Sequence, residues 1–89
     1  MNFKVEVTKR FEKDIQSLEN EQQKQILKAS LKLENDPFGF NRNQNIVKLK
    51  GYKNEYRLRV GDFKIRFEIN TRSKTVILLT VAHRRESYR

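Results

Sequence analysis

Hydrophobic residues near the N-terminus change from a strand-like to a helix-like period. Apolar and charged residues alternate over residues 3–7, which predicts a short strand with one buried face. Thr8 can cap a helix, in which Phe11, Ile15 and Leu18 then form an apolar stripe among charged and amide side chains. The chain is therefore expected to begin with a strand that leads directly into an amphipathic helix.

A second helical pattern follows and is expected to complete a helix hairpin. Asn20 and Gln23 have the spacing of a capping box, and Asp36 followed by Pro37 would end the helix. The apolar positions between these signals are Ile26, Leu27, Leu31 and Leu33. Residues 38–45 contain glycine and several asparagines with no clear period, so this segment is predicted to be a loop.

The second half of the chain has a strand-like pattern. Runs with period two cover residues 46–50, 55–60, 63–69 and 75–83, and a four-strand meander is the simplest arrangement. The last run is apolar almost throughout, which favours a central strand over an edge strand. We therefore expect an α+β fold, in which an antiparallel β-sheet that includes the first strand carries the N-terminal αα-hairpin on one face.

The charge balance narrows the class of partner. The 89 residues are enough for one domain, residues 1–89, with a core drawn from 36% hydrophobic residues. Twenty Lys and Arg against eleven Asp and Glu give a formal net charge of +9. On so small a domain this charge produces a strong positive field, for which a nucleic acid or an acidic protein is the natural partner. A surface that is basic only for solubility is the alternative.

Several classes of site are excluded by what the sequence lacks. Without cysteine there is no thiolate metal site, and a single histidine argues against a histidine-based zinc site, so we expect no metal and no cofactor. No apolar run has the length of about 20 residues that a membrane helix needs, and no signal peptide is evident. The cytoplasm is the expected location, without a membrane partner.

A tight hairpin is predicted around a Gly-Asp turn at residues 61–62. A two-residue turn with glycine at its first central position fixes the register of the flanking strands. Arg59 then faces Lys64 and Arg57 faces Arg66 on one side of the sheet, while the other side is apolar. Directly opposed cations destabilise a sheet unless water or a bridging anion compensates them. The face is thus either a phosphate-binding surface or a solvated face that discourages edge-to-edge pairing.

Two further groups of residues flank this hairpin. Lys48 and Lys50 alternate with apolar residues on the preceding strand and could extend the basic surface, although lysines on a strand face are common. The C-terminal residues add an imidazole, further cations and an aromatic ring: His83, Arg84, Arg85 and Tyr88. This tail could stack on an unpaired base beside the basic face, or it could be a frayed terminus.

Motifs along nearly the whole chain resemble one family. They are the run Val47–Gly51, the hairpin Tyr56–Ile65 and the ending His83–Tyr88, all following a strand and a helix hairpin. In this order they resemble the RelE/ParE superfamily of toxins from type II toxin-antitoxin systems. The resemblance implies a RelE-like, microbial RNase-type fold and a ribosome-dependent endoribonuclease that cleaves mRNA in the ribosomal A site. It also implies a RelB-like antitoxin as partner, acidic overall or in its toxin-binding segment.

The resemblance also assigns site residues. In that family the working groups are basic side chains of the sheet face with a C-terminal arginine and tyrosine, which correspond here to Arg57, Arg59, Lys64, Arg84 and Tyr88. The catalytic set expected from it is Arg59, Lys64, Arg84 and Tyr88. The expected RNA contacts are Lys48, Lys50, Arg57, Arg66 and Arg85.

Cleavage of RNA without a metal needs a base for the ribose 2′-OH, cations for the pentavalent phosphorus and an acid for the leaving 5′-oxygen. The surrounding arginines should disfavour the ammonium form of Lys64, which makes it a candidate base. Arg59 and Arg84 would stabilise the phosphorane. Tyr88 would stack on a base or donate a proton, and His83 is the rival acid or base.

Two other functions remain open at this level. A ParE-like protein would inhibit DNA gyrase, and its cations would then form a protein-docking surface. A non-catalytic relative would bind nucleic acid through charge alone, with salt-sensitive binding and no turnover.

Overall fold

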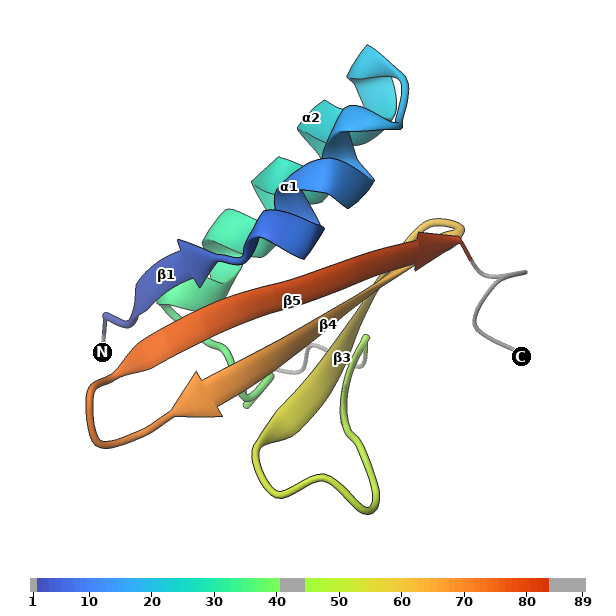
Figure 1. The fold of residues 1–89 in the computed structure, drawn as a ribbon. Coiled ribbons are helices and arrows are strands. Elements are labelled where there is room, and N and C mark those ends of the chain that lie inside the picture. The colour runs from blue at the N-terminus through green and yellow to red at the C-terminus, as the bar shows by residue number, and fades with distance from the viewer. Residues whose placement is uncertain (1, 41–44, 84–89) are drawn as a thin grey trace.

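The computed structural model of this chain describes residues 2–40 and 45–83. The elements in chain order are β1 (Lys4–Val7), α1 (Lys9–Gln16), α2 (Asn20–Leu31), the 3-10 helix η1 (Lys32–Glu34), β2 (Ile46–Lys48), β3 (Glu55–Val60), β4 (Phe63–Asn70) and β5 (Thr75–His83). Within these residues the strands form one five-stranded sheet in the order β1-β5-β4-β3-β2. Figure 1 shows α1 and α2 on one side of this sheet, where α1 packs against β5 and α2 against β3, which confirms the predicted α+β fold.

The predicted meander and the predicted central position of the last strand are both confirmed. Strands β2 to β5 pair antiparallel in succession, and β5 lies between β4 and β1. The sheet is nevertheless mixed, because β1 runs parallel to β5, with Lys4 beside Thr75 and Val7 beside Leu78. Alternation of apolar residues does not encode strand direction, so the sequence pattern could not reveal this parallel pair.

The first helix begins where the sequence predicts. The Thr8 hydroxyl oxygen accepts a hydrogen bond from the Phe11 amide at 3.1 Å, as an N-cap does. The same hydroxyl lies 3.1 Å from the Leu78 carbonyl and 2.9 Å from the Leu79 carbonyl on β5. Thr8 therefore both starts α1 and attaches it to β5, an interior strand of the sheet.

The second helix begins with a capping box one residue earlier than predicted. Glu19 is the N-cap, and its backbone N–H donates to the Gln22 side chain at 3.3 Å. The sequence pattern placed Gln23 in the box, but its side-chain Nε2 instead donates a hydrogen bond to the Leu18 carbonyl oxygen at 2.8 Å. A glutamate can serve as the capping acceptor here, so the prediction that favoured Asn20 was wrong by one position.

The apolar residues of the second helix divide between core and solvent. Ile26 and Leu33 are buried, but Leu27 and Leu31 are 45% and 58% exposed. The α-helix ends at Leu31, and the 3-10 turn of η1 carries the chain on to Glu34. The four apolar positions of the helical pattern therefore do not form one buried face, and Leu33 lies in η1 rather than in the α-helix.

The core lies between the helices and the sheet face that they cover. Its fully buried larger side chains include Phe11 and Ile26 from the helices and Ile65, Phe67 and Leu78 from the strands. Burial reaches Phe3 and part of Val5, whereas Val7 is exposed on the edge strand, so the predicted buried face of residues 3–7 is incomplete. Across the described ranges no helix is long and apolar enough to cross a membrane.

Candidate nucleic-acid interface

The hairpin of β3 and β4 has the predicted turn and register. Gly61 has a φ of +57°, whereas the φ of Asp62 is negative. A positive φ at the first central residue alone is the pattern of a type II′ turn. Val60 pairs with Phe63, and the register continues through Arg59 with Lys64 to Arg57 with Arg66. The glycine conformation thus sets which side chains face one another across the hairpin.

Burial alternates along both strands and separates a basic face from the core. The apolar side chains of this hairpin that pack beneath the helices are Leu58, Val60, Phe63, Ile65 and Phe67, all buried. The intervening side chains are exposed or half-buried: Arg57, Arg59, Lys64 and Arg66, which we call the basic face. The prediction that these four cations project from one side, away from the helices, is confirmed.

The two cation pairs of the basic face have different surroundings. Arg66 Nη2 lies 2.5 Å from Glu55 Oε1, and its guanidinium carbon lies 5.2 Å from the centroid of the Tyr52 ring. Among the described residues no acidic group forms an ion pair with Arg57 or Arg59. Arg66 is thus partly neutralised by Glu55, whereas Arg57 and Arg59 have no such ion pair within the described ranges.

A pair of carboxylates borders the basic face at its other end. Glu55 and Glu68 are directly opposed in the register, one same-face step beyond Arg57 and Arg66. Both are half-buried. The face is therefore polarised, with cations at the turn and acids at the distal end. The sequence pattern already contained this signal, because Glu55 has the same parity along β3 as the two arginines.

The interior strand β5 contributes small and uncharged side chains to the same surface. Ala82 pairs with Lys64, and Thr80 pairs with Arg66. Both side chains are short, so they do not project beyond the neighbouring cations of β4. This leaves room for a nucleic-acid backbone to lie across the surface.

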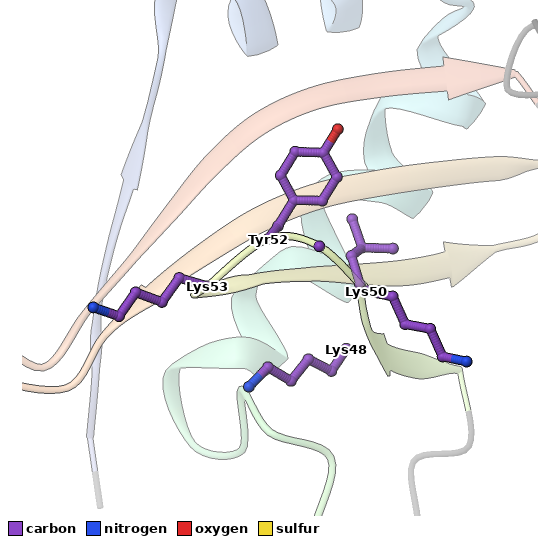
Figure 2. Close-up of a pocket in the computed structure, with 6 residues that line it drawn as sticks. Lys48, Lys50, Tyr52 and Lys53 are labelled. Atoms are coloured by element: carbon purple, nitrogen blue, oxygen red, sulfur yellow. The ribbon is translucent and has the colours of Figure 1, made fainter.

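The register of β2 contradicts one expectation about the lysines. Lys48 pairs with Tyr56 and Val47 pairs with Arg57, so Val47, not Lys48, shares the basic face. Lys50 lies beyond the end of β2, in the loop that leads to β3. Figure 2 shows Lys48, Lys50 and Lys53 pointing in different directions around this loop. The lysines therefore do not extend the basic face as a continuous strip.

The geometry also separates His83 from the basic face. His83 pairs with Phe63 on the helix side of the sheet, and their rings meet edge to face with centroids 5.4 Å apart. The imidazole lines a cavity of about 340 Å³ with Asp14 and Ser17 of the first helix and its C-cap. The sheet thus lies between His83 and Lys64, which argues against the predicted acid or base role for His83 at the basic face.

Three predicted site residues lie outside the described part of the chain. They are Arg84, Arg85 and Tyr88, and their roles stay predictions. In their place the structure draws attention to Tyr52, which sequence reasoning missed because it lies in a loop without a period. Its 50% exposure and its contact with Arg66 place an aromatic ring beside the cations.

Comparisons with known proteins bear on the whole of this architecture. A family model described as the ParE toxin of type II toxin-antitoxin systems, parDE, matches residues 5–88. Toxin RelE3 of Methanocaldococcus jannaschii is 34% identical over 86 residues, which are 97% of this chain and 96% of that protein.

Solved structures agree with this similarity. One chain of the archaeal RelE-RelB complex from Pyrococcus horikoshii OT3 is 27% identical, with a TM-score of 0.80 over 94% of this chain and 97% of that one. One chain of the RelB-RelE antitoxin-toxin complex from Methanococcus jannaschii is 34% identical, with a TM-score of 0.75 over 94% of this chain and 95% of that one. The fold, the hairpin and the sequence thus point in the same direction.

Proposed function

This chain belongs to the RelE/ParE superfamily of type II toxin-antitoxin toxins, and from that premise we propose that it cleaves mRNA in the ribosomal A site. It would act in the cytoplasm and inhibit translation, and an acidic antitoxin related to RelB would neutralise it. The observation that carries the proposal is the polarised basic face, where Arg57, Arg59 and Lys64 lie together on an open sheet surface. The similar toxins of known structure were solved in complexes with RelB, which supports an antitoxin partner.

The facing positions of Arg59 and Lys64 suit phosphoryl chemistry. Directly opposed residues have Cβ atoms about 4.5–5.5 Å apart, so both side chains can contact one phosphate. Lys64 would accept the proton of the ribose 2′-OH, whose oxygen then attacks the adjacent phosphorus. Arg59, joined by Arg84, would stabilise the negative charge of the phosphorane. The 5′-oxygen leaves with a proton, for which Tyr88 is the candidate donor, and a 2′,3′-cyclic phosphate remains.

Arg57 has a different part in this proposal. It lies one same-face step from Arg59, and no described acidic residue pairs with it. A guanidinium in this position can hold the neighbouring phosphate and so fix the register of the RNA on the face. Its role is positioning the backbone.

The test uses programmed ribosomes and maps cut sites by primer extension. Wild type should cut the A-site codon, and Arg59→Ala and Lys64→Ala should each lower the rate by about 10²- to 10⁴-fold. Lys13→Ala removes an exposed cation from α1 and should cut at the wild-type rate, which controls for net charge. Undiminished cleavage by an Arg84→Ala, Tyr88→Ala double variant would contradict the assignment of the C-terminal residues.

The description of the matching family model favours one second candidate. It names ParE, and a ParE-like protein would act on DNA gyrase, with the basic face as a docking surface for protein or DNA. A wild-type protein that cuts no ribosomal mRNA but traps gyrase in a cleavage complex would establish this alternative.

A further inference from the structure

An exposed aromatic ring is fixed beside the basic face by residues of the sheet. Tyr52 lies in the loop between β2 and β3, is 50% exposed, and is not part of the buried core. Its ring has the Arg66 guanidinium over it at 5.2 Å from the centroid. A tyrosine that is neither buried nor needed for packing is available to contact a ligand.

The guanidinium beneath this ring is itself held in place. Arg66 belongs to β4 and forms an ion pair with Glu55 of β3 at 2.5 Å, and the Glu55 side chain is only 18% exposed. Contacts from Glu55 to Arg66 and from Arg66 to Tyr52 therefore connect the aromatic ring of the loop to the paired strands β3 and β4. We call these three residues the Tyr52 platform. Because Glu55 neutralises Arg66, this arginine is better suited to supporting the ring than to binding phosphate.

The platform lies at a suitable distance from the proposed reaction centre. Arg66 and Lys64 are two residues apart on one strand, which corresponds to about 7 Å. A single nucleotide bridges such a separation between its phosphate and its base. Figure 2 shows the Tyr52 side chain pointing away from Lys48 at the end of β2 and from Lys50 and Lys53 of its own loop, so these lysines do not cover the ring.

We propose that the outer face of the Tyr52 ring stacks on an unpaired base of the mRNA, next to the nucleotide whose phosphate contacts Arg59 and Lys64. This inference rests on the proposed function and adds a residue that orients the RNA. Aromatic stacking accepts any base, because every base has a π face, and it suits single-stranded RNA beside a basic surface. Support from Arg66 on the inner face preorganises the ring, so little conformational freedom is lost on binding.

The experiment places a fluorescent base at the proposed contact. Ribosomes are programmed with an mRNA whose A-site nucleotides carry 2′-O-methyl groups, which block attack, and 2-aminopurine replaces one base at a time. Titration with wild type should quench the fluorescence at one position, since stacking quenches 2-aminopurine. Tyr52→Ala should abolish that quenching and weaken binding by about tenfold or more. Tyr52→Phe should retain both effects, whereas Tyr52→Leu, which keeps bulk without a π face, should not.

Three controls test whether a loss of quenching reports the loss of stacking on Tyr52. Lys53→Ala removes a neighbouring loop cation and should leave the quenching unchanged. An abasic nucleotide at the quenched position should make wild type and Tyr52→Ala bind equally, because there is no base left to stack. Thermal unfolding should show that Tyr52→Ala is folded, as expected for an exposed loop residue.

The outcomes are distinct. If Tyr52→Ala quenches and binds as wild type does while Arg59→Ala abolishes cleavage of unmodified mRNA, the stacking inference is overturned and the proposed function stands. If wild type neither cleaves nor binds the programmed ribosome, the proposed function fails, and the stacking inference fails with it.

Discussion

The ion pair between Glu55 and Arg66 makes the electrostatics of the basic face testable without RNA. Its atoms are 2.5 Å apart, with side chains 18% and 42% exposed. A hydrogen-bonded charged pair in a partly enclosed site contributes about 1 kcal/mol, within the range between open surface pairs and stronger charged hydrogen bonds. Removing Glu55 also leaves Arg66 opposite Arg57 without compensation, which costs up to about 1 kcal/mol more. Glu55→Gln should therefore lower the free energy of unfolding by about 1–2 kcal/mol.

Thermal and urea unfolding measure this loss. For a domain of this size each kcal/mol corresponds to about 4–8 °C, so Glu55→Gln should lower the Tm by about 4–16 °C. Added salt should narrow the difference, because it screens the repulsion between Arg57 and Arg66. The matched control is Glu6→Gln, which removes an ion pair with Lys4. Its Nζ and Oε2 atoms are 3.7 Å apart, and the side chains of Lys4 and Glu6 are 75% and 51% exposed. Its effect should be below about 0.5 kcal/mol.

A double-mutant cycle with Arg66→Gln isolates the pair itself. If Glu55 and Arg66 interact as described, the double variant should be less destabilised than the sum of the two single variants, by about 1 kcal/mol. A coupling energy below about 0.3 kcal/mol would refute the reasoning. It would mean that the contact does not persist in solution, and the proposed support of Tyr52 would lose its basis.

Three further predictions test the fold and the corrected site. Thr8→Ala should destabilise by about 1–2 kcal/mol, because it removes the α1 cap and the link to β5, and Thr8→Ser should retain most of the stability; urea unfolding checks both. Leu31→Ala should change the unfolding free energy by no more than about 0.5 kcal/mol because the side chain is exposed, whereas Ile26→Ala, in the core, should cost about 2–5 kcal/mol. His83→Gln should cleave ribosomal mRNA at the wild-type rate, and a large loss would contradict its separation from Lys64 by the sheet.

The hairpin could be predicted in detail because its register depends on neighbouring residues alone. A two-residue turn with glycine in the left-handed region leaves one possible pairing, and every same-face pair follows by counting from Gly61. The pairing of β2 with β3 is different, because a longer loop joins them and no tight turn fixes the count. A shift of one residue exchanges the two faces, which is why Val47 and not Lys48 lies beside Arg57.

The second helix shows why periodicity alone could not assign its buried face. Ile26 of α2 and Leu33 of the following 3-10 helix η1 are both buried, and their spacing of seven residues is close to two turns of a continuous α-helix. Leu27 and Leu31 are also helically spaced, but their stripe is rotated by about 100° or more from the first. Both stripes are apolar in the sequence. Only packing against the sheet determines that the first is buried and the second is exposed.

The rows of the hairpin face suggest where a nucleic-acid backbone would lie. Counting from the turn, the same-face rows are Arg59 with Lys64, Arg57 with Arg66, and Glu55 with Glu68. Successive rows are about 7 Å apart, which is less than the screening length of about 8 Å at physiological salt. The carboxylates therefore lower the positive potential of the middle row strongly and that of the turn row only weakly. In the proposed complex a phosphate would thus be held best at the turn, and the RNA would leave the face before the acidic row, close to the Tyr52 ring that contacts Arg66.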